Sequence, residues 1–154
     1  MIWAWVWGAW SVAVAGGLPP GMAEVDAGDQ AWALGDRGLA REQWARAVAG
    51  GGPAAVAMGE LRLLFVSGNL GLAVHGPRAD RALGQCPMVD PWCRLAAADR
   101  LLVAGTLGMP ADTARAVELA SSAVGALPGP ATARLVWAGA APVAALEDHP
   151  AGGL

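Results

Sequence analysis

The stretch from Ala27 to Pro53 constrains the fold of this chain most strongly, because it places small and large residues at helical spacing. Ala40, Trp44 and Ala47 are four and three residues apart, so they lie on one face of a helix as a small, large, small ridge. Small residues let a neighbouring helix approach closely, and a tryptophan fills the space beside them. Gly35 suits the tight turn at the end of a preceding helix. The stretch therefore predicts two helices packed as a pair.

The same ridge recurs twice further along the chain. Shifting the first unit by 33 residues carries Asp29 onto Arg62, Trp32 onto Phe65 and Gly35 onto Gly68. The two later ridges are Ala79, Leu83 and Cys86, and Ala116, Ala120 and Ala123. The apolar pattern and the start and stop signals predict helices at Glu24–Leu34, Leu39–Val48, Ala54–Val66, Trp92–Leu107, Pro110–Leu127 and Ala131–Ala140. Asp90 before Pro91 is a typical helix start.

The second ridge, Ala79, Leu83 and Cys86, matches the 33-residue shift only if six extra residues are inserted before it. We place this insertion within Asn69–Pro77 and expect it to form a connection between the paired helices. Long connections often carry function, so this segment, with His75 in it, is a candidate binding surface.

The glycine, aromatic, alanine and proline positions of Ala27–Pro53 resemble a tetratricopeptide repeat (TPR). The lengthened spacing and the run Gly108-Met109-Pro110 also resemble Sel1-like repeats. Both families imply an all-α, right-handed stack of antiparallel helix pairs, here about three pairs and a terminal helix in a short TPR-like solenoid. They also imply a surface for a protein or peptide partner. The residues that the resemblance assigns to that surface are Asp29, Trp32, Arg62, Phe65 and Asp99. The competing interpretation is that Trp32 and Phe65 are interhelical core, and it is favoured because most aromatic residues in helical repeats are packed inside.

Residues 1–17 contain no charged side chain and predict a secretory signal peptide. Two small-residue cleavage contexts follow, Ala13-Val14-Ala15 before Gly16 and Gly21-Met22-Ala23 before Glu24. A retained, tryptophan-rich membrane anchor and a buried helix of the domain are the alternatives. We therefore divide the chain into a signal peptide or anchor (1–23), a TPR-like domain (24–148) and a flexible tail (149–154).

Cys86 and Cys93 flank a short connection between two predicted helices. In an exported protein we expect them to form a disulfide; the alternative is two reduced cysteines, with Cys86 a small core residue. Two thiols do not complete a tetrahedral zinc site, and His75 and His149 add no metal-ligand spacing. We therefore expect no metal and no cofactor.

The composition argues against a nucleic-acid partner, because the net charge is −3 and all ten cationic residues are arginines without a basic cluster. No serine or histidine lies in a catalytic motif, so we expect no enzyme activity. The expected function is that of an exported scaffold, periplasmic or extracellular, that binds a protein or peptide. The alternative is a membrane-anchored structural or assembly subunit of a larger complex, held through residues 1–17.

Overall fold

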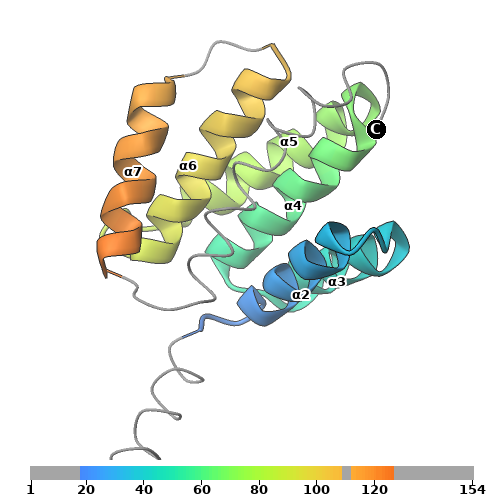
Figure 1. The fold of residues 1–154 in the computed structure, drawn as a ribbon. Helices are drawn as coiled ribbons and strands as arrows, with labels where there is room; N and C mark the ends of the chain where they lie inside the picture. The colour runs from blue at the N-terminus through green and yellow to red at the C-terminus, as the bar shows by residue number, and fades with distance from the viewer. Residues whose placement is uncertain (1–17, 109–111, 127–154) are drawn as a thin grey trace, which may run out of the picture.

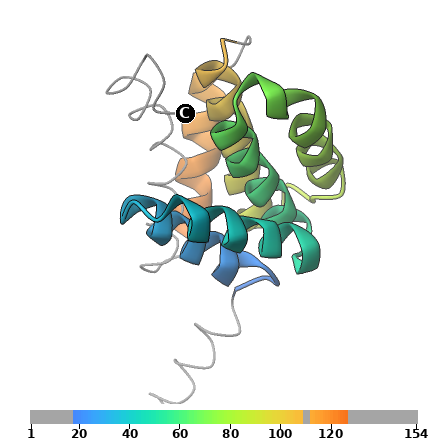
Figure 2. The same ribbon diagram turned by 90° about the vertical axis from the view of Figure 1, so that its right-hand side faces the viewer.

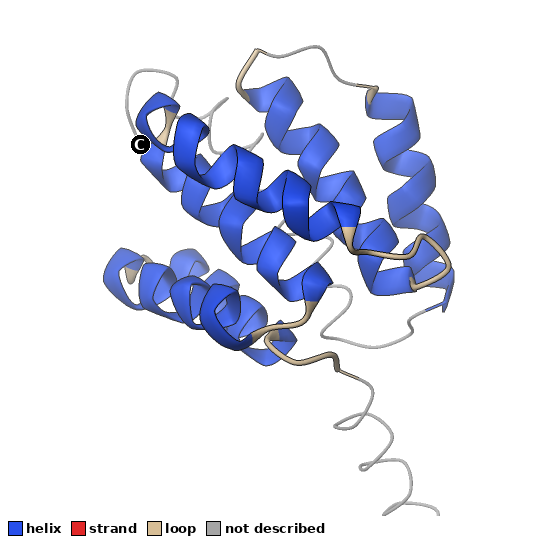
Figure 3. Cartoon of the chain, turned by 180° about the vertical axis from the view of Figure 1, so that it is seen from behind, coloured by secondary structure: helices blue, strands red, loops and turns tan. Residues whose placement is uncertain are grey.

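The structure, a computed structural model, describes residues 18–108 and 112–126. These residues form helices and no strand, which confirms the predicted all-α class for this part of the chain (Figure 3). The helices are α2 (Met22–Ala33), α3 (Arg37–Gly50), α4 (Pro53–Ser67), α5 (Asn69–Gly84), α6 (Pro91–Thr106) and α7 (Thr113–Ala126). The predicted segments at residues 1–17, 131–140 and 149–154 lie outside the described residues.

Each helix packs against the next one in the sequence, and α4 is the centre of the assembly. The most extensive contacts join α2 to α3, α4 to α5 and α6 to α7 (Figure 1). Helix α4 also contacts α2, α3 and α6, and Figure 2 shows α2 and α3 side by side below it. Because neighbours surround α4, its sequence is apolar at most positions, with Glu60 and Arg62 as the buried exceptions.

Local sequence signals account for the helix ends. The Asp36 side chain accepts a hydrogen bond from the backbone N–H of Leu39 (3.0 Å) and so caps α3. Asp90 caps α6 in the same way, before Pro91, as predicted. Gly35 and Gly68 follow α2 and α4 with φ of 85° and 58°, values that L-residues with a Cβ adopt at a cost.

The predicted connection at Asn69–Pro77 is wrong, because these residues form the first half of α5. Only Gly68 separates α4 from α5. Pro77 lies inside the helix, where it removes one backbone hydrogen bond at a cost of about 3 kcal/mol. Contacts with α4 offset this cost: Leu72 packs against the apolar cluster that contains Leu61 and Leu64, and His75 bonds to Glu60. The insertion therefore lengthens a helix instead of a loop.

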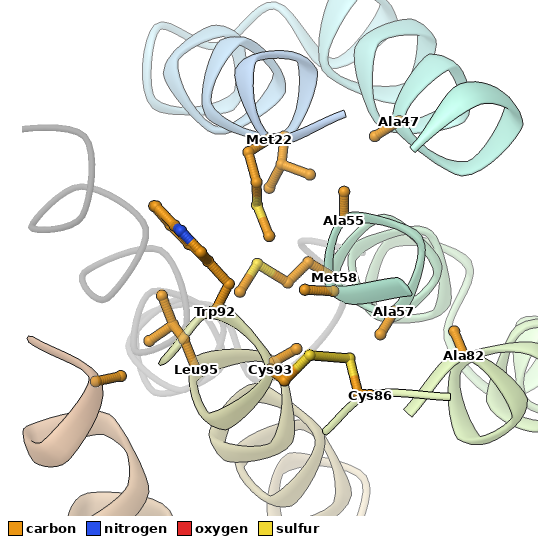
Figure 4. Packing of buried hydrophobic residues seen from close by; sticks show 14 residues of the cluster. Met22, Ala47, Ala55, Ala57, Met58, Ala82, Cys86, Trp92, Cys93 and Leu95 are labelled. Carbon is orange, nitrogen blue, oxygen red and sulfur yellow. A yellow bond between two sulfur atoms is a disulfide. The ribbon is translucent and has the colours of Figure 1, made fainter. Parts of the chain in front are cut away.

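The largest apolar cluster lies where α2, α4 and α6 converge (Figure 4). Met22, Met58 and Trp92 point toward one another, and small alanines of α3, α4 and α5 let the backbones approach around them. Beside them Cys86 and Cys93 are paired as a disulfide, with their Cα atoms 5.4 Å apart. The disulfide links Cys86, which lies just beyond the C-cap of α5, to the first turn of α6. The two cysteines therefore lie at the distance that their predicted pairing requires.

Replacing both Cys86 and Cys93 with alanine should lower the free energy of unfolding by about 2–3 kcal/mol, because the unfolded chain loses a short covalent loop. A reductant should lower the melting temperature of the unsubstituted protein to about that of the double variant. It should leave the melting temperature of the double variant unchanged. Thermal unfolding followed by circular dichroism, with and without reductant, measures both effects. Equal melting temperatures for the oxidised protein and the double variant would contradict this expectation.

Candidate functional site

Three of the predicted site residues form a buried ion triad that consists of Asp29, Arg62 and Asp99. They come from α2, α4 and α6, one from each of the first helices of the pairs. The Arg62 guanidinium donates from Nε and a terminal nitrogen to the two carboxylate oxygens of Asp29 (2.6 and 3.0 Å). Its other terminal nitrogen donates to Asp99 Oδ2 (2.9 Å) and to the Met58 carbonyl (3.3 Å). The charged groups of these three residues are thus paired with one another inside the fold.

Trp44 connects this triad to the ridge of α3. Its indole Nε1–H donates to Asp29 Oδ1 (3.0 Å), while its neighbours Ala40 and Ala47 are fully buried. Gly28 makes the approach possible, because a Cβ at that position would lie 2.4 Å from Trp44 Nε1. The sequence indicated that Trp44 fills space, but its role as a hydrogen-bond donor to a buried carboxylate appears only in the structure.

The carboxyl groups of the triad are strongly desolvated. Burial raises the pKa of Asp29, and the charge of Arg62 offsets this effect only in part. Burial also raises the pKa of Asp99 against the opposing charge of Arg62. For Arg62, burial acts to lower the pKa, but the two carboxylates outweigh it and raise the pKa, so the guanidinium stays charged. The triad contains two carboxyl groups and one cation, the Arg62 guanidinium.

Two further predicted binding residues, Trp32 and Phe65, contact each other. Their ring centroids are 6.3 Å apart in an edge-to-face arrangement, and Trp32 also contacts Trp44 at 5.9 Å. Phe65 is only 4% exposed and belongs to the core, whereas Trp32 is half-buried. The guanidinium of Arg37 lies 5.3 Å from the Trp32 ring centroid, within the range of a cation–π contact. Of these two predicted binding residues, Trp32 is thus the one with surface left for a ligand.

Two exposed leucines follow that tryptophan in the sequence. Leu34 is 87% exposed and Leu39 is 42% exposed, both beside the turn between α2 and α3. We call Trp32, Leu34, Arg37 and Leu39 the Trp32 corner.

His75 contacts a buried acid that sequence reasoning missed. Its Nδ1 lies 2.5 Å from Oε2 of Glu60, which is 2% exposed, and the Arg78 guanidinium lies 4.0 Å from Oε1 of the same carboxylate. A polar link thus joins α4 to α5. Glu60 stands alone in the apolar run from Pro53 to Leu61, and an acid in such a run is the signal that points to a buried partner.

None of the helices in residues 18–108 and 112–126 has the length and apolarity needed to cross a membrane. Within the same residues, no group of three or more histidine, cysteine, aspartate or glutamate side chains has the arrangement to hold a metal ion.

The class that the described residues define is an all-helical protein with packed neighbouring helices and a repeat-like pattern. No family model, curated protein or solved structure matches the chain.

Proposed function

We propose that this protein is an exported, TPR-like scaffold that binds a protein or peptide segment at the Trp32 corner, without catalysis. The observation that carries the proposal is the setting of Trp32. The buried rings of Trp44 and Phe65 and the Arg37 guanidinium hold its indole in place, yet Trp32 is only half-buried. A rigid aromatic with exposed apolar neighbours is the typical anchor of a protein interface.

The repeated geometry of the first helices supports the solenoid part of the proposal. Asp29 and Arg62, 33 positions apart, pair directly, and so do Trp32 and Phe65. Contacts between repeat-equivalent positions are expected when successive helix pairs stack with a constant step. A third left-handed glycine, Gly108, ends α6 as Gly35 and Gly68 end α2 and α4. The resemblance to TPR or Sel1-like repeats is consistent with this arrangement.

The charges around the Trp32 corner suggest the chemistry of the bound segment. Arg37 and Arg41 are both exposed on the first turns of α3. Arg41 also reaches the carbonyl of Val66 (3.4 Å), which holds it next to the end of α4. A segment with an apolar side chain for Trp32 and an acidic side chain for these arginines matches the corner best.

The disulfide supports export, because disulfides persist mainly in oxidising compartments. We therefore place the scaffold in the periplasm or outside the cell, and the binding surface on the exported side.

Substituting Trp32 with alanine should weaken partner binding by about 30-fold or more, the effect of removing an interface anchor worth about 2 kcal/mol. The partner is first captured from the source cells with the unsubstituted protein and identified by mass spectrometry. The purified pair is then titrated by calorimetry. Unchanged affinity in the Trp32→Ala variant would refute the proposed site.

Two matched variants make that result specific. Val117 is exposed on α7, so Val117→Ala should leave both binding and melting temperature unchanged. Phe65→Ala should lower the melting temperature, since Phe65 is core. Trp32→Ala should retain the helical circular dichroism spectrum, which separates loss of binding from loss of folding.

A further inference from the structure

The segment just before α2 is built into the helical assembly. The backbone N–H of Gly52, between α3 and α4, donates to the Pro20 carbonyl (2.8 Å), and the N–H of Met22 donates to the Pro19 carbonyl (3.1 Å). Met22 itself is 0% exposed and points into the largest apolar cluster (Figure 4). The packed region thus includes residues 18–22, which precede the expected domain start at residue 24.

Gly21 fixes the position of this segment. Its φ of 89° is left-handed, and a Cβ there would lie 2.7 Å from the Gly51 Cα and 2.9 Å from the Ala55 Cβ. The Gly21 carbonyl accepts the first intrahelical bond of α2, from the N–H of Val25 (3.1 Å). The backbone at Gly21 is therefore both the start of α2 and a contact surface for the turn between α3 and α4.

These contacts distinguish the two cleavage contexts in the sequence. Cleavage after Ala23 would remove Met22 from the core and Gly21 from the start of α2. It would also remove the Pro20 carbonyl, which accepts the hydrogen bond from the Gly52 N–H. Cleavage after Ala15 would leave all of these in place, with Gly16 and Gly17 ahead of Leu18.

We infer that the processing site of the exported chain is the Ala15–Gly16 peptide bond and not the Ala23–Glu24 bond. Hydrolysis by a signal-peptidase-type protease adds water across that bond and leaves a carboxylate on Ala15 and an amine on Gly16. The inference rests on the export part of the proposed function. Its physical basis is that the mature chain must keep Pro20, Gly21 and Met22 to complete its core.

The first test is the N-terminus of the protein recovered from the exported fraction of its own cells, by intact mass and N-terminal sequencing. A start at Gly16 supports the inference. A start at Glu24 overturns it and leaves the proposed function intact, since binding at Trp32 is measured separately. An unprocessed chain overturns it as well: in a membrane fraction that result favours the anchored subunit, and in the cytoplasm it also removes export from the proposed function.

Matched substitutions in the full chain locate the bond. A leucine at Ala15 should block processing and accumulate the precursor, because the position before the bond requires a small residue. Ala23→Leu should be processed normally, and since Ala23 is exposed the change should not disturb the fold. Blocked processing in Ala23→Leu together with normal processing in Ala15→Leu would overturn the assignment.

The stability of the two possible products provides an independent readout. A chain that begins at Glu24 should melt about 10 °C below a chain that begins at Gly16, because loss of the Met22 side chain leaves a cavity between Met58 and Trp92. Equal melting temperatures would overturn the physical basis of the inference.

Discussion

Replacing Arg62 with methionine will lower the free energy of unfolding by about 3–5 kcal/mol, the typical cost of removing one partner from a buried ion pair. The substitution leaves the carboxyl groups of Asp29 and Asp99 buried without the cation that both of them contact. Three helices, α2, α4 and α6, lose their common polar link at once. Chemical denaturation with urea measures the change, which is a large fraction of the total stability of a typical domain.

A triple variant separates lost charge pairing from lost packing. Asp29→Asn, Arg62→Met and Asp99→Leu together remove every charge of the triad, and the asparagine keeps an acceptor for Trp44 Nε1–H. We expect this variant to recover most of the loss, because apolar replacement of a whole buried ion cluster is often neutral. A triple variant as unstable as Arg62→Met alone would show that the guanidinium acts through its packing.

The loss in Arg62→Met should also depend on pH. Burial raises the pKa of Asp29 and Asp99 even with Arg62 present, and without its charge nothing in the triad opposes that effect. A carboxyl group with a raised folded-state pKa binds more protons in the folded than in the unfolded state. The destabilisation should therefore be greatest at neutral pH and shrink as the pH falls through the raised folded-state pKa values toward the unfolded value near 4. A loss that is constant with pH would contradict this electrostatic account.

Gly28→Val should lower the free energy of unfolding by about 3 kcal/mol, through overpacking and a lost hydrogen bond. A Cβ at residue 28 would lie 2.4 Å from Trp44 Nε1 and 3.1 Å from the Ala40 carbonyl, which is backbone and moves little. Trp44 must therefore shift away and give up its bond to Asp29. Thermal unfolding measures the loss.

Gly38→Ala is the matched control for that change. Gly38 lies on the first turn of α3, and a Cβ there meets only Asp36 Oδ1 at 3.7 Å, an ordinary contact. The variant should be as stable as the unsubstituted protein or up to about 1 kcal/mol more stable, because alanine is the better helix former. A similar loss in both variants would mean that the contact with Trp44 is not the cause.

The helices were predictable because their signals are local. Asp36, Asp90, Pro91 and the turn glycines mark the ends, and the ridge of Ala40, Trp44 and Ala47 marks the buried face of α3. The insertion at Asn69–Pro77 was misplaced for a physical reason. A proline in the sequence argues against a helix by about 3 kcal/mol, and the contacts of α5 with α4 that offset it are not visible along the chain.

The same distinction between local signals and tertiary contacts applies to the candidate site. The sequence by itself predicted that Asp29 and Arg62 are equivalent positions of successive repeats, that Trp32 and Phe65 are another such pair, and that Cys86 and Cys93 can meet. It did not determine whether those positions face a groove or a neighbouring helix, because helical periodicity gives the direction of a side chain and not what lies in front of it. Only the tertiary structure decided that. It brings Asp99 and Trp44 up to Asp29 and Arg62, closes the core over Phe65 and leaves Trp32 half-buried at the surface.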